Sequence, residues 1–379
     1  MQAFFAKIIS FFMAILMFFG IDIGKKPDPE IPVNKDYPNM IDTGTHGDHH
    51  IQGIAVDTAK GFLYCSFTTS LLKFTLDGEL VGSVEGFVGH LGCISAGKSD
   101  RNIYGALEYI NDEIGSGIEG SPDTNAFYIA IFNMDRITRV GMRPEDDGVM
   151  TAVYLAEAVN DYNATGTDKN GNTVPHKYGC SGIDGLAIGP MFGETENKTE
   201  YLYIDCGPYS DLTRNDNDNM VIQCYKLDEL KTYAKPLSQD DLHFSGPEKP
   251  LHKFFCYTGN TEYGIQNLEY DEYTNTFFAA VYKGKKKEFP NYPLFAFDAS
   301  IAPVYSDETQ YEGTITLKKF GSTDPKTGIS GSTFPYGSTG FFAFGDGNYY
   351  ISEPYDIFGQ RGSKIRKYTL SGDEFIYAK

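Results

Sequence analysis

Short apolar runs, separated by Gly, Asp and Asn, recur along the chain from residue 50 to its end. Runs of about four to eight apolar residues bounded by turn residues are typical of β-strands. One pattern, approximately Gly-x-x-Gly followed by apolar residues, occurs five times. Its copies are residues 50–57, 89–96, 182–189, 264–271 and 337–344. The pattern predicts an all-β protein built from repeated units.

Each copy is followed by further strand-like runs, and an aromatic residue recurs in the first of them. The expected second strands are residues 63–67, 103–107, 202–206, 277–281 and 349–353. The expected third strands are residues 73–77, 131–135, 223–228, 295–298 and 366–370. The expected fourth strands are residues 80–84, 150–154, 251–257, 314–319 and 374–377. Four short strands per repeat are typical of a β-propeller.

We therefore predict one β-propeller of five four-stranded blades over residues 45–379. Successive copies begin 39, 93, 82 and 73 residues apart, so the later blades carry insertions, which we expect in surface loops. The longest gap leaves a sixth blade between residues 110 and 180 as the alternative. Residues 36–45 are expected to add a strand to the last blade and close the ring, because closure removes an exposed sheet edge.

The N-terminus differs from the rest of the chain. Residues 8–21 are almost continuously apolar, with Lys7 before them and a Pro-rich stretch after them. Fourteen apolar residues are short for a membrane-spanning helix, which needs about 20, and suit a signal peptide. Because no Ala-x-Ala cleavage site follows, residues 1–24 are assigned as a signal peptide or an N-terminal membrane anchor. Residues 25–44 are assigned as a linker, and the protein is predicted to be secreted or surface-anchored.

Composition narrows the class of partner. The 51 acidic and 32 basic residues give a net charge of -19, which disfavours nucleic acid because phosphate binding needs a basic surface. A small molecule, a glycan or a protein remains as the ligand, and contact with a membrane is expected only through the N-terminal segment. Six Cys without paired spacing favour buried free thiols, with a Cys206–Cys224 disulfide as the alternative.

Over residues 45–379 the repeat resembles β-propellers in general. These include five-bladed calcium-dependent nucleotidases and furanosidase-type glycosidases, and six-bladed lactonases. The resemblance is at the level of the blade, and it implies the fold alone. None of the catalytic motifs of those families occurs at matching positions, so no catalytic residue is carried over from them.

The innermost strands of a propeller start on one face near the axis, so equivalent positions of all blades meet there. The position before the second Gly of the pattern is Leu in one copy and an oxygen-bearing residue in the other four. These four are Gln52, Asp184, Gln266 and Thr339. Calcium takes carboxylate, amide and hydroxyl oxygens, so the four residues are candidate ligands for calcium. The alternative is a polar lining for a water-filled channel, with no cofactor.

The ends of the second strands carry an acid–Tyr–acid theme in three blades, on the same predicted face as three histidines. The candidate catalytic groups are His50, His90, Glu108 and Asp112. The candidate ligand-binding residues are His49, Tyr109, Asp205, Tyr209, Asp211, Glu353, Tyr355 and Asp356. Carboxylates near His supply proton transfer or hydrogen bonds to sugar hydroxyls, and Tyr rings stack on ligands. The alternative is that these are ordinary turn and capping residues.

Two hypotheses follow for the function. The first is an exported or surface-anchored propeller that binds a small polar, glycan or protein ligand on its axial face. The second is a calcium-assisted hydrolase of a lactone, phosphoester or glycoside, and the sequence leaves open whether the protein is an enzyme. The first is favoured because no catalytic constellation has diagnostic spacing. The basic run of residues 283–288 is expected to be a solvated loop, with an anion site as the alternative.

Overall fold

A computed structural model describes residues 37–378 except 48, 112–114 and 307. Five antiparallel sheets follow one another around a ring, which confirms the five-bladed propeller and leaves no sixth blade in the described residues. Blade 1 contains β2 (Ile51–Asp57), β3 (Phe62–Phe67), β4 (Ser70–Thr75) and β5 (Leu80–Glu85). Blade 2 contains β6 (His90–Ala96), β7 (Asn102–Tyr109), β8 (Ala126–Asn133) and β9 (Met150–Tyr154).

The remaining blades are less regular. Blade 3 contains β12 (Cys180–Gly189), β13 (Tyr201–Pro208), β14 (Asn219–Lys226) and β15 (His252–Tyr257), extended by β20 (Glu312–Thr314) and β19 (Val304–Tyr305). Blade 4 contains β16 (Glu262–Asp271), β17 (Thr276–Tyr282) and β18 (Leu294–Asp298). Blade 5 contains β23 (Phe341–Ala343), β24 (Asn348–Ile357), β25 (Gln360–Ser371) and β26 (Glu374–Tyr377).

Insertions between the blade strands carry the helices and the small hairpins. The helices are α2 (Ala156–Asn163) and α3 (Leu227–Lys231), with single 3-10 turns at Gly115–Gly117, Met134–Arg136, Asp146–Gly148 and Lys177–Gly179. The hairpins are β10 (Thr165–Thr167) with β11 (Thr173–Pro175), and β21 (Ser322–Thr323) with β22 (Ser330–Gly331). Residues 110–180 therefore hold the outer strands of blade 2, a helix and a hairpin.

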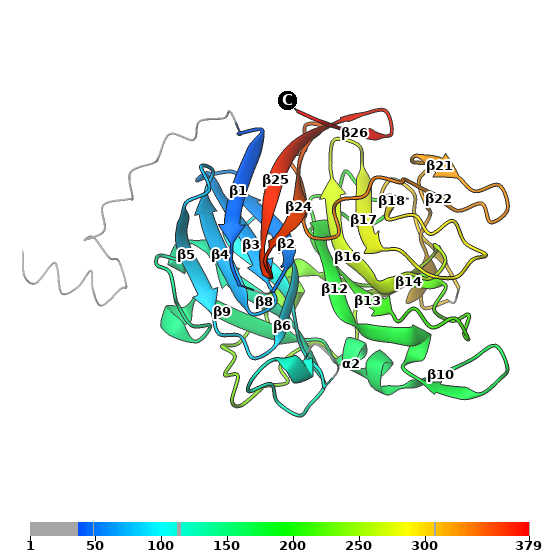
Figure 1. Cartoon of the computed structure of the whole chain (residues 1–379). Helices are drawn as coiled ribbons and strands as arrows, with labels where there is room; N and C mark the ends of the chain where they lie inside the picture. Colours follow the sequence, from blue (N-terminus) through cyan, green and yellow to red (C-terminus); the bar gives the residue numbers. More distant parts are fainter. Residues whose placement is uncertain (1–36, 48, 112–114, 307, 379) are drawn as a thin grey trace, which may run out of the picture.

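The ring is closed by the N-terminal strand β1 (Met40–Thr45), which pairs antiparallel with β25. Figure 1 shows β1, in blue, beside β25, in red. The first half of β25 pairs with β1 and its second half with β26, so both chain ends complete the outer edge of blade 5. The closing strand is thus confirmed, and the propeller begins at Met40, within the residues assigned to the linker.

The fourth strand predicted for blade 4 is divided between two sheets. At its start, Thr314 pairs with Phe255 at the outer edge of blade 3. Further on, the Asp298 N–H donates to the carbonyl of Thr316 and the Lys318 N–H to that of Ala296, at 3.1 and 2.8 Å, so this part runs along blade 4. The segment therefore joins the edges of two neighbouring blades.

The hydrophobic core lies between the blades. Five clusters of buried side chains fill the five interfaces between neighbouring sheets. Leu63 and Ile365, for example, meet between blades 1 and 5. All six cysteines are buried free thiols, as favoured from the sequence. The strand register places Tyr203, and not Cys206, opposite Cys224, so the alternative disulfide is wrong.

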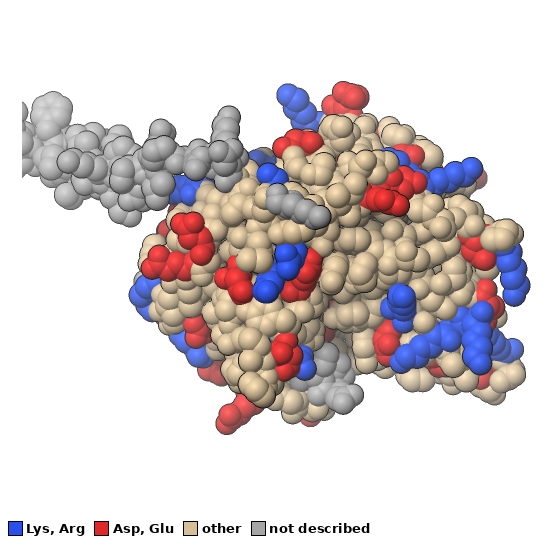
Figure 2. Space-filling model, turned by 45° about the horizontal axis from the view of Figure 1, so that its top comes forward, with Lys and Arg blue, Asp and Glu red and all other residues tan. Residues whose placement is uncertain are grey.

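Charged side chains are spread over the surface. On the face seen in Figure 2, acidic groups occur in small scattered groups, several beside basic ones, and one larger gathering of Lys and Arg lies at the lower right. The described part of the chain contains no helix that is both long and apolar enough to cross a membrane. The predicted export segment lies outside the described residues.

Candidate functional site

The Gly-x-x-Gly pattern corresponds to a break in strand pairing. In β2, Ile51 pairs with Phe67 and Gly53 with Ser66, so Gln52 has no partner in β3. Similar irregularities occur in β12 around Asp184 and in β16 around Gln266. A bulge leaves its extra residue unpaired and redirects its side chain. Three members of the predicted column, Gln52, Asp184 and Gln266, therefore lie at bulges near the starts of innermost strands, whereas Thr339 lies just before β23.

The second Gly of the pattern is required because innermost strands approach each other closely. A Cβ on Gly53 would lie 2.7 Å from the backbone nitrogen of Ile94 in blade 2, and one on Gly185 would lie 2.7 Å from the carbonyl oxygen of Ile265 in blade 4. Contacts this short do not occur for real side chains, so any larger residue would push the blades apart.

Asn267 occupies the second-Gly position in blade 4, and its side chain spans the centre of the ring. Its amide nitrogen donates to the carbonyls of Gln52, at 2.8 Å, and Ser338, at 3.0 Å. The thiol of Cys93 lies 3.5 Å from the amide oxygen of Asn267. Only 1% of Asn267 is exposed. One buried amide therefore links four of the five blades.

Where the innermost strands begin, a cavity of about 140 Å³ lies between the blades. We call it the His90 cavity. Six of the predicted site residues line it, from four blades, namely His50, Gln52, His90, Glu108, Asp184 and Gln266. Sequence analysis missed the other lining residues, which are Ser181, Gly182, Ile183, Tyr263 and Tyr282. Tyr282 comes directly after the second strand predicted for blade 4, but it lacks the acidic neighbours of the theme used in the search.

A hydrogen-bonded pair, His90 and Glu108, forms one wall of the cavity. His90 Nδ1 lies 3.0 Å from Glu108 Oε1, and both side chains are more than nine-tenths buried. The second oxygen of Glu108 accepts a hydrogen bond from the Ile183 N–H at 3.0 Å, in the next blade. A Cβ on Gly182 would lie 2.3 Å from this oxygen, so the first Gly of the third copy makes room for the carboxylate.

Asp184 is the second carboxyl group of the cavity. Its Oδ1 accepts a hydrogen bond from the Cys93 N–H at 2.9 Å. Burial raises the pKa of Asp184 to about 7, although His90 opposes the shift, and the negative charge of Glu108 raises the pKa further. Asp184 therefore changes protonation state near neutral pH, which is the range useful for proton transfer.

His50 is held as the neutral imidazole. Arg361 Nη1 lies 3.2 Å from His50 Nδ1, and because a guanidinium only donates, Nδ1 accepts and Nε2 carries the proton. Nε2 lies 3.5 Å from the hydroxyl of Tyr282, to which it can donate. Burial, reinforced by Arg361, lowers the pKa of His50 to about 4. Burial also raises the pKa of Tyr282 to about 12, so its hydroxyl stays protonated and can donate.

Three of the four predicted calcium ligands line the His90 cavity. The amide nitrogens of Gln52 and Gln266 donate to the Thr68 hydroxyl and the Tyr263 carbonyl, both at 3.3 Å, which leaves the amide oxygens for a ligand. Thr339 does not line the cavity, and its hydroxyl donates to Ser352 at 3.0 Å. Within the described residues, no three His, Cys, Asp or Glu side chains form a metal cluster. The oxygens that fit calcium are one carboxylate and two amides, so calcium stays a prediction.

The ligand-binding residues predicted in blades 2 and 3 lie outside the cavity lining. Tyr109 is fully buried and packs edge-on against Tyr128 at 5.8 Å, so its ring belongs to the core. Asp205 is also fully buried, its Oδ2 accepts from the Ile265 N–H at 2.7 Å, and burial raises its pKa well above the usual range. The ring centroids of Tyr209 and Tyr263 are 6.2 Å apart, and because Tyr263 lines the cavity, Tyr209 lies beside it.

The acid–Tyr–acid residues of blade 5 make their contacts with neighbouring strands and with the turn after β24. Glu353 accepts from Arg366 at 2.8 Å and from the Tyr368 hydroxyl at 2.5 Å. Tyr355 donates to Asp42 at 2.6 Å, and Asp356 accepts from the Gly359 N–H at 2.8 Å. None of the three lines the His90 cavity, but Asp356 lies 3.5 Å from Arg361 Nε, and Nη1 of the same guanidinium contacts His50 Nδ1 at 3.2 Å.

Two predicted site residues, His49 and Asp112, lie apart from the cavity lining or outside the described residues. His49 is partly buried and lies two residues before the start of β2. Asp112 lies outside the described residues.

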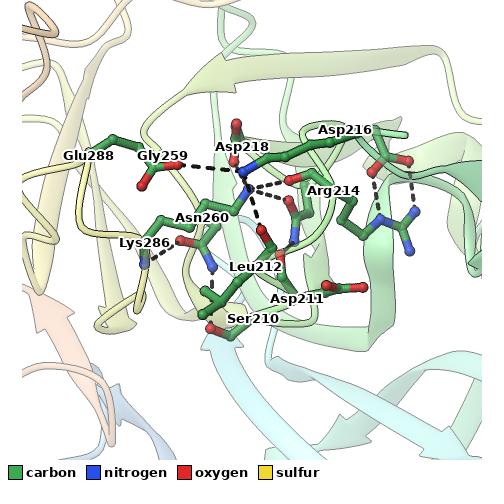
Figure 3. A network of polar contacts seen from close by, with 12 residues as sticks. Ser210, Asp211, Leu212, Arg214, Asp216, Asp218, Gly259, Asn260, Lys286 and Glu288 are labelled. Atoms are coloured by element: carbon green, nitrogen blue, oxygen red, sulfur yellow. Dashed lines mark hydrogen bonds and ion pairs between the residues drawn. The ribbon is translucent and has the colours of Figure 1, made fainter. Parts of the chain in front are cut away.

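Asp211 and the basic run belong to a loop network, shown in Figure 3, that we call the Lys286 network. The ammonium of Lys286 contacts the Asp218 carboxylate, the Arg214 carbonyl at 2.6 Å and Asn217 Oδ1 at 2.8 Å. The Arg214 side chain binds Asp216 through two nitrogens, and Asp211 accepts from Thr213. Lys286 is only 3% exposed, so the expectation of a fully solvated basic loop is wrong at this residue.

The comparisons with known proteins add no family. No family model and no curated protein matches the chain. Among solved structures, the chain is similar to hydrazine synthase of Kuenenia stuttgartiensis, at 9% identity and a TM-score of 0.37, over 80% of this chain and 64% of that one. It is also similar to the Cps50 (Swd1) β-propeller domain of Myceliophteria thermophila, at 10% identity and a TM-score of 0.32, over 85% and 84% of the two chains.

A third similar structure is a protein of unknown function from Bacteroides caccae. It has 11% identity and a TM-score of 0.32, over 70% of this chain and 86% of that one. Likenesses this distant carry no argument about activity or ligand. The fold is that of a β-propeller, and the function has to be argued from the site itself.

Proposed function

We propose that this protein is a binding propeller whose His90 cavity takes a small, uncharged polar ligand rich in hydroxyl or amide groups. The observation that carries the proposal is the convergence of six polar side chains from four blades on one cavity of about 140 Å³. A cavity of this kind, with a few convergent polar groups, is the usual form of a small-molecule site.

The charges in the cavity favour an uncharged ligand. His50 is neutral, and the carboxylate of Glu108 is already bound by His90 and by the Ile183 N–H, so neither offers a free charge to a ligand. The Tyr282 hydroxyl offers a donor, whereas the amide oxygens of Gln52 and Gln266 offer acceptors. A molecule that both donates and accepts hydrogen bonds fits this set, as a single sugar residue or a polyol does.

The test is a thermal-unfolding screen of the full chain against monosaccharides, polyols and small amides, followed by calorimetric titration of each probe that shifts the melting temperature. A ligand that binds only the folded state raises that temperature. We expect Gln52→Ala and Gln266→Ala to weaken binding by roughly tenfold or more, because each removes a buried hydrogen-bonding group. Tyr355→Phe is the matched control outside the cavity and should bind like the unsubstituted protein. Equal binding by all variants, or no saturable binding by any probe, would contradict the proposal.

A calcium-assisted hydrolase is the second candidate, and the observation that favours it is that the oxygens of Gln52, Asp184 and Gln266 line the same cavity as the His90–Glu108 pair. Elemental analysis and thermal unfolding with calcium or a chelator test the metal. One calcium per chain, together with a lower melting temperature after chelation, would support this candidate and direct assays to lactones, phosphoesters and glycosides. Hydrolysis that is lost in Asp184→Asn would then separate an enzyme from a binding protein.

We also propose that the protein acts outside the cytoplasm, either secreted or held at the surface by its N-terminus. The support is the apolar run of residues 8–21 behind Lys7 and before a Pro-rich linker. Fractionation of cells that express the full chain, with mass spectrometry of its N-terminus, tests both the location and the cleavage.

A further inference from the structure

A second cavity opens at the other end of the innermost strands. It has a volume of about 520 Å³, and we call it the Glu269 cavity. All five innermost strands contribute to it near their C-terminal ends, through Asp57, Ser95, Ile188, Glu269 and Ala343 among others. The His90 cavity lies at the N-terminal ends of the same strands, with Asn267 between the two. The two cavities therefore occupy opposite faces of the ring.

Glu269 is a buried carboxyl group with few partners. It is 9% exposed, and its Oε1 accepts a hydrogen bond from the Ala343 N–H at 2.9 Å. Within the described residues this is the only hydrogen bond of its side chain. Ser95, which is 6% exposed, also lines the cavity, and its hydroxyl has no hydrogen-bond partner among the described residues. Neither this hydroxyl nor an oxygen of Glu269 is among the fully enclosed polar atoms that lack a partner, so both groups are accessible to a ligand from the cavity.

The other charged groups that line the Glu269 cavity are already paired. Arg101 binds Asp57 at 2.6 Å, Lys231 binds Asp100 at 3.2 Å, and Lys98 lies 3.6 Å from Glu272. Glu269 has no ion pair within the described part of the chain. Burial raises the pKa of Glu269 to about 8, although the Ala343 hydrogen bond and the charge of Lys98 oppose the shift. A positively charged ligand in contact with Glu269 would favour its ionised form and form an ion pair with it.

The wall beside Glu269 is aromatic. Its hydrogen-bond partner Ala343 lies between Phe342 and Phe344, and both rings line the cavity and are partly buried. Their centroids are 5.1 Å apart in an edge-to-face arrangement. Aromatic faces attract cations and also accept a hydrocarbon chain. Carboxylate, hydroxyl and aromatic rings together form a recognition set for an alkylammonium group.

We propose that the Glu269 cavity binds a small organic cation, whose ammonium group contacts Glu269 and Ser95 and whose carbon chain lies against Phe342 and Phe344. This site is separate from the His90 cavity and does not depend on the function proposed for it. Its ligand differs in chemistry, since the His90 cavity is matched to an uncharged ligand.

The test is calorimetric titration of the full chain with n-butylammonium chloride and with 1-butanol, its uncharged counterpart. We expect saturable binding of the ammonium and at least about tenfold weaker binding of the alcohol, because the charge-assisted hydrogen bond to Glu269 is missing. Glu269→Gln should lose at least about tenfold in affinity for the ammonium. The Gln side chain keeps an acceptor for the Ala343 N–H, so the variant is expected to fold, which its thermal unfolding checks.

Two control variants isolate the effect of Glu269. Glu272→Gln removes an exposed carboxylate at the rim and should change affinity by less than about threefold, because exposed ion pairs contribute little. Asp184→Asn alters only the His90 cavity and should leave butylammonium binding unchanged. Equal affinity for butanol, unchanged binding by Glu269→Gln, or the absence of saturable butylammonium binding would overturn the proposal.

Discussion

The His90 cavity and the Lys286 network lie at the same end of the ring, where the second strands of the blades finish, and both bury charged side chains. In the network, every charge meets a protein group, since Lys286 contacts Asp218 and Arg214 contacts Asp216. In the cavity, by contrast, Asp184 and the two Gln side chains face a space. The comparison shows that burial of a charged side chain does not by itself indicate a ligand site. A buried polar group indicates one when it lines a cavity and is not fully paired by protein groups.

The largest expected effect is loss of stability when the Lys286 network is broken. Lys286→Ala leaves the Asp218 carboxylate buried without its cation, which costs about 3 to 5 kcal/mol for buried pairs. Urea unfolding measures this change in the free energy of unfolding. Lys287→Ala is the matched control, because Lys287 is an exposed neighbour and should change stability by less than about 0.5 kcal/mol. A loss below about 1 kcal/mol for Lys286→Ala would show that the network is not structural.

The next effect concerns the wall of the cavity. Gly182→Ala would place a Cβ 2.3 Å from Glu108 Oε2, on a residue whose φ is +138°. Strain and displacement of Glu108 together should cost about 2 to 4 kcal/mol. Gly117→Ala is the control, because a Cβ there meets nothing within 4 Å. Thermal unfolding of both variants tests the contact, and equal stability would contradict it.

The smallest effect at any one pH step is a change in pH dependence. The folded-state pKa of Asp184 is raised to about 7 from 3.8, so the folded protein binds more protons than the unfolded chain between these values. The stability contributed by this group is therefore lost as the pH rises from about 4 to about 7. Asp184→Asn should remove this slope, which is at most about 1.4 kcal/mol per pH unit for one proton.

His50 gives the opposite sign and serves as an internal control. Its folded-state pKa is lowered to about 4 from 6.5, so its contribution to stability is lost as the pH falls through this window. His50→Gln should therefore weaken acid destabilisation, whereas Asp184→Asn should weaken the loss of stability toward neutral pH. Urea unfolding at several pH values measures both slopes, and identical pH profiles for the two variants would contradict these assignments.

The blade pattern was predictable because its glycines have a steric cause. Gly53 and Gly185 are required where innermost strands nearly touch, so the repeat marks the axis of the ring. The divided strand after residue 312 was not predictable in the same way. A strand pattern indicates which residues are extended, but the sheet edge that an outer strand joins depends on packing between blades.

The candidate site was predictable where bulges fix side-chain direction, as at Gln52 and Asp184. At the ends of the second strands the theme found Glu108, which lines the cavity, but it also selected Tyr109 and Glu353, which do not, because neighbouring residues of a strand point to opposite faces. In blade 5, Ser352 is fully buried and bonds to Thr339, whereas Glu353, one residue later, points outward to Arg366. The acid–Tyr–acid theme does not show whether the acidic residue lies on the buried or on the outward side of its strand.

The pairing of β1 with β25 also has a consequence for folding kinetics. The Ser363 N–H donates a hydrogen bond to the Thr43 hydroxyl, and the two residues are 320 positions apart in the sequence. The entropy of closing such a loop grows only with the logarithm of its length, and stability suffers little. Folding rate falls as contacts become less local, however, and blade 5 cannot be completed until the C-terminal strands exist. The strand that is synthesised first in the ring is therefore among the last to find its partner.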